Sequence, residues 1–169
     1  MDNLIPILLW GQPAATREIR IVDRKNQDVT ILLVEDDEVD VRAIHRGLDK
    51  QRIANPVVPA CDGLEALQLL RGEGGRAKVP RPYLILLDLN MPRMNGIQFL
   101  QELRRDPALS DSIVFVLTTS AAEEDQVAAY KAHIAGYLVK SDAGENFLKA
   151  IQLLDKYVIT VQFPPEHAA

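Results

Sequence analysis

Cysteine is almost absent from this 169-residue chain, which contains one residue of that type. A single thiol excludes an internal disulfide bond and a metal site built from several cysteines. The residue, Cys61, lies between the apolar stretch from Val57 to Ala60 and a turn at Asp62 and Gly63. We therefore expect Cys61 to be buried as a small hydrophobic side chain.

Long apolar runs and long basic runs are also missing. No apolar run approaches the ~20 residues that cross a bilayer, and the segment Leu4 to Trp10 is interrupted by Pro6 and preceded by Asp2. Without a basic flank, this segment does not resemble a secretory signal, so we expect a cytoplasmic protein with no membrane partner. The net charge of -5 at pH 7 and the lack of a Lys/Arg block argue against direct binding of nucleic acid.

The length of the chain and its hydrophobic content of 47% suit one compact domain with short extensions. We expect the domain at residues 29–157, an N-terminal extension or arm at residues 1–28, and a C-terminal tail at residues 158–169. The tail is β-branched and apolar before Pro164 and Pro165, which disfavours a solvated helix to its end. It either contacts a dimer partner or folds back on its own domain.

Five compact apolar runs alternate with amphipathic segments along the chain. Near-continuous hydrophobicity without polar alternation is typical of strands that are covered on both faces. The runs that predict strands are Ile31 to Val34, Pro56 to Ala60, Tyr83 to Leu87, Ile113 to Leu117 and Gly136 to Val139. Their alternation with helices predicts a doubly wound α/β fold, with a parallel sheet, right-handed crossovers and helices on both faces.

Apolar residues at helical spacing mark the segments between the strands. The expected apolar faces are Val41, Ile44 and Leu48 in the first helix, Leu64, Leu67 and Leu70 in the second, Ile97, Leu100 and Leu103 in the third, and Phe147, Ile151, Leu154 and Val158 in the last. The fourth helix, around Glu123 to His133, has only Val127, Tyr130 and Ile134 to anchor it. A weakly anchored helix can shift relative to the sheet.

Carboxylates directly follow two of the expected strands. Glu35, Asp36, Asp37 and Glu38 follow the first strand, and Asp88 follows the third. In a doubly wound sheet, ligands bind outside the carboxyl ends of the strands. Oxygen ligands from several strand ends suit a hard divalent cation such as magnesium.

These acids have an alternative role, because Asp and Glu also favour the first turn of a helix. That role suits Asp37 and Glu38 best, since they lie where the first helix should begin. It suits Asp88 poorly, because Asn95 is better placed to cap the helix that starts near Gly96.

Two further strands end in polar residues at the same expected edge. Thr118 follows the fourth strand, where its hydroxyl is either a satisfied turn group or a contact for a phosphoryl oxygen. Lys140 follows the fifth strand and offers a point charge that can pair with Asp88 or with phosphate. Four strand ends therefore carry residues suited to handling phosphate and its metal.

With these motifs in this order, the chain from about Thr30 to Tyr157 resembles the receiver domain of bacterial response regulators. The resemblance implies a flavodoxin-like five-stranded sheet of order 2-1-3-4-5, with Asp88 as the phosphoacceptor. It also implies a Mg²⁺ site formed by the acidic pair Glu35 and Asp36 together with Asp88. The run of four acids would permit a register one residue later.

The same resemblance assigns roles to further residues. Thr118 and Tyr137 fall at the positions of the switch hydroxyl and the switch aromatic side chain, and Lys140 falls at the position of the family's lysine. The backbone carbonyl of Asn90 would be a further magnesium ligand. The side chains of Asn90 and Ser120 would tune the lifetime of the phosphoaspartate.

Three segments together resemble one subgroup of the family, the single-domain regulators that are paired with phytochrome-type sensor kinases. These segments are Asp40-Val41-Arg42, the stretch from Arg81 to Asn90, and Leu138-Val139-Lys140-Ser141. Ser141 departs from the proline that most receivers have after the lysine, which leaves the geometry of the Lys140–Ser141 peptide open.

The resemblance implies a signalling phosphoacceptor rather than an enzyme. A histidine kinase would phosphorylate Asp88, and the face formed by the fourth helix, fifth strand and fifth helix would then change. A homodimer through that face or through the terminal extensions is the expected assembly. Two alternatives are a phosphorylation-independent scaffold and an aspartyl-phosphate phosphatase of the haloacid-dehalogenase type, although the latter class has a second acid where this chain has Asn90.

Overall fold

The computed structural model describes residues 6–7, 20–21, 29–140, 152–153, 156–157 and 160–161. Two short strands, β1 (Pro6–Ile7) and β2 (Arg20–Ile21), pair in antiparallel fashion before the main fold. The expected boundaries of the domain at residues 29 and 157 stay predictions. Among the described residues, no helix is both long and apolar enough to cross a membrane.

The main sheet has five parallel strands, as the apolar runs predict. The strands are β3 (Thr30–Val34), β4 (Val57–Ala60), β5 (Tyr83–Leu87), β6 (Ile113–Thr118) and β7 (Gly136–Val139). Their spatial order is β4-β3-β5-β6-β7, which is the order 2-1-3-4-5 when the sheet is counted from β3. The doubly wound α/β fold is therefore confirmed, and the carboxyl ends of all five strands lie along one edge.

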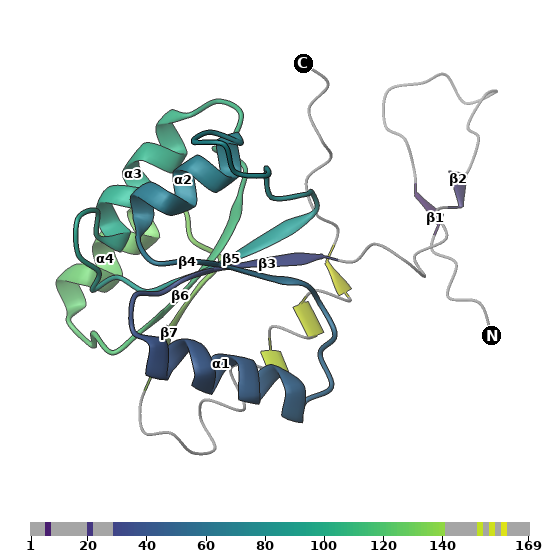
Figure 1. Cartoon of the computed structure of the whole chain (residues 1–169), viewed down its shortest axis with the longest axis horizontal. Helices are drawn as coiled ribbons and strands as arrows, with labels where there is room; N and C mark the ends of the chain where they lie inside the picture. Colours follow the sequence, from purple (N-terminus) through teal and green to yellow (C-terminus); the bar gives the residue numbers. More distant parts are fainter. Residues whose placement is uncertain are drawn as a thin grey trace.

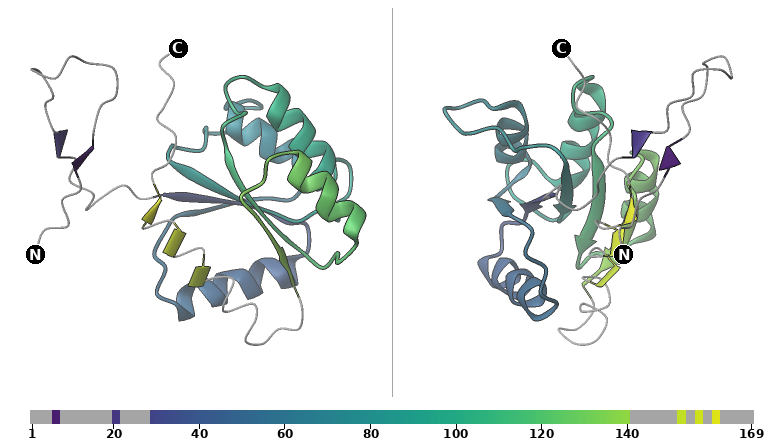
Figure 2. Two further views of the ribbon diagram at one scale, coloured as in Figure 1. Left: turned by 180° about the vertical axis from the view of Figure 1, so that it is seen from behind. Right: turned by 90° about the vertical axis from the view of Figure 1, so that its right-hand side faces the viewer.

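Helices cover both faces of this sheet (Figures 1 and 2). Helix α1 (Glu38–Lys50) lies on one face, whereas α2 (Gly63–Arg71), α3 (Gly96–Arg105) and α4 (Glu123–Lys131) lie on the other. The side chains of each strand alternate between the two faces. Ile31 and Leu33 of β3 thus join the core beneath α1, and Leu32 and Val34 join the core beneath α2 and α3.

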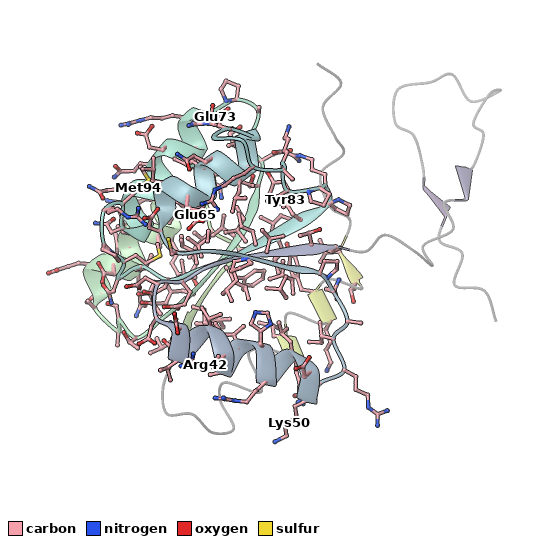
Figure 3. All side chains as sticks on the ribbon, in the orientation of Figure 1. Arg42, Lys50, Glu65, Glu73, Tyr83 and Met94 are labelled. Atoms are coloured by element: carbon pink, nitrogen blue, oxygen red, sulfur yellow. The ribbon has the colours of Figure 1, made fainter. Side chains whose placement is uncertain are left out.

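Most of the apolar residues expected to anchor the helices are buried. Ile44 and Leu48 of α1, Leu67 and Leu70 of α2, and Leu100 and Leu103 of α3 are at most 3% exposed. Arg42 and Lys50 project from the side of α1 away from the sheet (Figure 3). The prediction for Leu64 is wrong, because this residue is 45% exposed and α2 instead buries Ala66 and Leu69.

The apolar face predicted for α4 is also wrong in two of its three residues. Val127 and Tyr130 are 46% and 54% exposed, and Ala129 is the buried residue of this helix. Ile134 is buried as expected, but it lies after the helix, which ends at Lys131. The apolar surface of α4 therefore faces outward.

The final helix lies largely outside the described residues. Its four expected anchors, Phe147, Ile151, Leu154 and Val158, are not among them, nor is the Lys140–Ser141 peptide. Tyr157 is described, and its ring packs edge-on against Phe115 of β6 with a centroid distance of 5.0 Å. That contact lies on the same face of the sheet as α1.

Candidate functional site

Three carboxylates meet at the carboxyl edge of the sheet. Glu35 and Asp36 follow β3 and Asp88 follows β5, and one oxygen from each lies within 4.8 Å of the others. Strands β3 and β5 are hydrogen-bonded neighbours with Val34 opposite Leu87. This register places the two acidic segments side by side, as the sequence predicts.

The next two acids belong to the start of α1. Asp37 is the N-cap residue, and its side chain accepts a 2.7 Å hydrogen bond from the amide of Val39. Glu38 is exposed and pairs with Arg42 at 3.1 Å. The geometry therefore favours Glu35 and Asp36, rather than a register one residue later, as the acids that face Asp88.

Asp88 is only 6% exposed. Its Oδ2 accepts a 2.9 Å hydrogen bond from the amide of Asn90, whereas its buried Oδ1 has no hydrogen-bond partner. A buried carboxylate oxygen without a donor is unfavourable by itself. Its position suits an oxygen that binds a cation or an incoming electrophile.

Gly96 allows the helix after Asp88 to approach the loop closely. A Cβ atom at Gly96 would lie 2.5 Å from the backbone oxygen of Asp88 and 2.8 Å from the Cα of Leu89. The capping box formed by Asn95 and Gln98 fixes the start of α3 at this point. The prediction that Asn95 caps this helix is confirmed, and Asp88 is left free for another role.

Lys140 is the cation of the site. Its Nζ forms an ion pair with Glu35, lies 2.8 Å from Oδ2 of Asp40, and lies 3.6 Å from Oδ1 of Asp88. Burial would lower the pKa of Lys140, but the hydrogen bonds to Asp40 and Glu35 outweigh burial and raise it. The group therefore stays fully charged at neutral pH.

The contact with Asp40 was not predicted from the sequence. In the sequence, Asp40 belongs to one of the three segments that resemble phytochrome-type regulators, and no local pattern links it to a lysine 100 residues later. Its acidic character in the first turn of α1 was the one available signal.

The donor set fits a hard divalent cation. Three carboxylates that converge within 4.8 Å repel one another, and Lys140 supplies a single positive charge against them. Burial raises the pKa of Glu35, even though the hydrogen bond to Lys140 acts in the opposite direction. A bound cation with oxygen coordination would relieve both effects.

Thr118 and Tyr137 are joined through the loop that follows β6. Thr118 is fully buried, and its Oγ1 accepts a 3.3 Å hydrogen bond from the amide of Ser120. The hydroxyl of Tyr137, on β7, donates to the backbone oxygen of Ser120 at 3.0 Å. A displacement of this loop would therefore affect both residues that lie at the switch positions implied by the resemblance.

The remaining expected site residues lie on the loops that border the pocket. Asn90, two residues after Asp88, is exposed. The hydroxyl of Ser120 donates to Oδ2 of Asp125 at 2.5 Å, so in this arrangement it is bound to the first turn of α4.

The prediction that Cys61 is buried is wrong, since the residue is exposed. Its Sγ lies 2.6 Å from Oε2 of Glu65 and accepts a 3.1 Å hydrogen bond from Arg93. Arg93 also forms an ion pair with the buried carboxylate of Asp62. Cys61 directly follows β4, an edge strand of the sheet, and its thiol contacts polar side chains instead of the expected apolar ones.

Comparison with known proteins identifies the family. The protein-family model for the "Response regulator receiver domain" matches residues 31–152. Response regulator Rcp1 of Synechocystis sp. is 38% identical over 143 residues, which cover 84% of this chain and 97% of Rcp1.

Solved structures agree with this match over most of the chain. The phosphorylated cyanobacterial phytochrome response regulator RcpA is 36% identical, with a TM-score of 0.75 over 82% of this chain and 100% of that one. The Mn²⁺-bound form of Rcp1 is 38% identical, with a TM-score of 0.73 over 81% of this chain and 99% of that one.

Proposed function

Because this chain belongs to the response regulator receiver domain family, we propose that it accepts a phosphoryl group on Asp88 from a histidine kinase. The observation that carries this proposal is the buried Oδ1 of Asp88, which accepts no hydrogen bond and lies 3.6 Å from Lys140 at the acidic edge of the sheet. The protein is a signalling receiver domain rather than an enzyme with a turnover substrate.

We propose magnesium as the physiological cation. Glu35, Asp36 and Asp88 would hold it together with the backbone carbonyl of Asn90. The relative Rcp1 has been solved in a Mn²⁺-bound form, and carboxylate and carbonyl oxygens are the ligands that Mg²⁺ prefers. When bound, the ion supplies positive charge that offsets the repulsion between the Asp88 carboxylate and the phosphoryl oxygens.

The residues of the chain then have distinct tasks in the transfer. Asp88 acts as the ionised nucleophile, and its oxygen forms a bond to phosphorus while the bond to the kinase histidine breaks. Lys140 lies close enough to approach the phosphoryl oxygens as a point charge. Positioning and charge neutralisation, rather than a strong nucleophile, are what this reaction requires.

Thr118 and Tyr137 are the proposed switch. The phosphoryl group adds acceptor oxygens that the Thr118 hydroxyl can bind. Movement of Thr118 toward these oxygens would displace the loop after β6, because the amide of Ser120 binds Thr118 and its carbonyl binds Tyr137. The side chains of Asn90 and Ser120 border the pocket and are proposed to tune the lifetime of the phosphoaspartate. Two conformations of this loop would differ in the surface of α4 and β7.

The experiment that tests this function is the intact mass of the protein after incubation with acetyl phosphate. We expect one phosphoryl adduct that requires Mg²⁺ and is lost in Asp88→Ala. The Glu73→Ala variant, changed at an exposed acid remote from the pocket, should still form the adduct. Failure of the wild type to form any adduct, with acetyl phosphate or with a histidine kinase, would contradict the proposal in favour of a phosphorylation-independent scaffold.

The similar proteins support a more specific proposal about the type of histidine kinase. RcpA is a phytochrome response regulator, and the similarity covers 82% of this chain and 100% of RcpA. We therefore propose a histidine kinase of the phytochrome type, which is tested by phosphotransfer from such a kinase to this protein under red and far-red light. A cytoplasmic location stays a prediction.

We also propose a homodimer that uses the outward face of α4 and β7, with or without the terminal extensions. Val127, Tyr130 and Val139 expose apolar surface there, and a shallow groove on α4 includes the first two. Exposed apolar patches are frequent at protein interfaces. Light scattering tests this proposal, and a monomeric mass at high concentration, with and without phosphorylation, would contradict it.

A further inference from the structure

We propose that Asp40 is a positioning residue, which holds the ammonium group of Lys140 toward Asp88 during phosphoryl transfer. This inference rests on the proposed function. It concerns a carboxylate outside the acidic cluster of Glu35, Asp36 and Asp88.

The geometry of Lys140 is the first observation. An ammonium group has three N–H donors, and here the Nζ atom contacts Glu35 and Asp40 while it lies 3.6 Å from Asp88. The Lys140 side chain is 11% exposed. The contacts with Glu35 and Asp40 therefore hold the ammonium group beside the phosphoacceptor.

Glu35 and Asp40, the two carboxylates that contact Lys140 and are called its anchors here, differ in their other interactions. Glu35 belongs to the acidic cluster and serves as a ligand in the proposed cation site, where its oxygens are shared with a stronger positive charge. Asp40 lies in the first turn of α1, its side chain is 36% exposed, and it is not part of that cluster. Asp40 is thus the anchor that stays available to Lys140 when Glu35 binds a cation.

The short hydrogen bond between Lys140 and Asp40 is the second observation. The 2.8 Å distance is typical of a charge-assisted bond. It joins the first turn of α1 to the end of β7 across 100 residues of sequence. The position of the ammonium group therefore depends on how the fold places the first turn of α1 relative to the end of β7.

A purely structural explanation exists for an acid at this position, because Asp40 lies in the first turn of α1 and interacts favourably with the helix dipole. Glu38 lies in the same turn and shares this effect, but it is exposed and pairs with Arg42 instead of Lys140. Glu38→Gln is therefore a control that removes the same charge from the same turn.

The test compares the rate of phosphorylation by acetyl phosphate at saturating Mg²⁺ in Asp40→Asn, Asp40→Glu and Glu38→Gln. We expect Asp40→Asn to lower the rate about tenfold, because a misplaced charged group loses much of its effect on the transition state. Asp40→Glu should recover part of the rate, and Glu38→Gln should stay within about twofold of the wild type. Thermal unfolding of each variant verifies that it is folded.

A second comparison distinguishes positioning from helix stability. In the Lys140→Gln background, where no ammonium group remains to be held, adding Asp40→Asn should cause no further loss of rate. An equal effect of Asp40→Asn and Glu38→Gln, or an undiminished effect of Asp40→Asn without Lys140, overturns the positioning role. If Asp88 of the wild type accepts no phosphoryl group, the proposed function itself fails.

Discussion

At the scale of single residues, the edge of the sheet combines reactive groups with partners that restrain them. One oxygen of Asp88 accepts a hydrogen bond from a backbone amide, and the other accepts none. Cys61, near the same edge, has its thiol bound between Glu65 and Arg93. The difference matters chemically, because an exposed but hydrogen-bonded thiol is less reactive than its exposure suggests.

The first prediction concerns the alkylation of Cys61. The hydrogen bond from the thiol to Glu65 raises the pKa of Cys61, and partial burial acts in the same direction. A raised pKa means that less thiolate is present at a given pH, so alkylation by iodoacetamide should require a higher pH than for an ordinary thiol. Glu65→Gln should shift the rate profile toward lower pH.

Mass spectrometry measures this reaction without ambiguity, because the chain has one cysteine. Glu73→Gln is the control, since it removes an equal charge from the exposed loop just after α2 (Figure 3). Identical rate profiles for Glu65→Gln and the wild type would show that the hydrogen bond does not restrain the thiol.

At the scale of secondary-structure elements, α4 is attached differently from the other helices. It buries Ala129 alone, and its N-cap residue, Ala122, makes no capping hydrogen bond. Its carboxyl end is instead held by Arg104 of α3, which donates to the backbone oxygens of Ala132 and His133. A helix held at one end by hydrogen bonds suits the proposed switch, because its amino end can move with the Ser120 loop.

The second prediction therefore concerns Arg104. Its guanidinium group also donates to the oxygens of Ser110 and Ser112, so Arg104→Met would leave four backbone oxygens without this donor. We expect a loss of about 2–4 kcal/mol in the free energy of unfolding, measured by urea denaturation. The pKa of Arg104 is lowered by burial, which reflects the desolvation that these bonds offset.

The neighbouring Arg105 supplies the control for this measurement. It is exposed and pairs with Glu102 within α3, so Arg105→Met should cost less than about 1 kcal/mol. Equal losses for the two variants would indicate that the hydrogen bonds of Arg104 to the end of α4 do not stabilise the fold.

At the scale of the whole molecule, the acidic pocket, which consists of Glu35, Asp36, Asp88 and Lys140, forms only when the strands of the sheet are assembled. Glu35 and Asp36 follow β3, Asp88 follows β5 and Lys140 follows β7, and β6 lies between β5 and β7. Apart from the adjacent Glu35 and Asp36, these groups lie about 50 or more residues apart in the sequence and come together only in the folded sheet. A cation that binds the assembled pocket must therefore stabilise the folded state as a whole.

The third prediction is that Mg²⁺ raises the unfolding temperature of the wild type. At a concentration 100 times the dissociation constant, the added free energy of unfolding should be about 2.7 kcal/mol. Asp36→Asn, which removes an exposed carboxylate from the cluster, should greatly reduce this increase. Scanning calorimetry with Glu124→Gln of α4 as the control measures it, and an undiminished increase in Asp36→Asn would place the ion elsewhere.

Local patterns in the sequence determined the five strands, the class of the fold and the edge at which the pocket forms. Continuous apolar runs identify strands because burial on both faces leaves no place for polar residues, and chain order then places Asp88 and Lys140 at one edge. Asn95 was identifiable as a cap for a similar local reason. The family resemblance followed from these same motifs.

Tertiary structure alone decided which side chains meet across the edge. Cys61 is exposed and contacts Arg93, which lies 32 positions away, and the contact between Asp40 and Lys140 joins residues 100 positions apart. The outward apolar face of α4 likewise reflects how Ala129 and Arg104 attach the helix. Helical spacing reports which residues share a face, but the packing of neighbouring elements determines whether that face is covered.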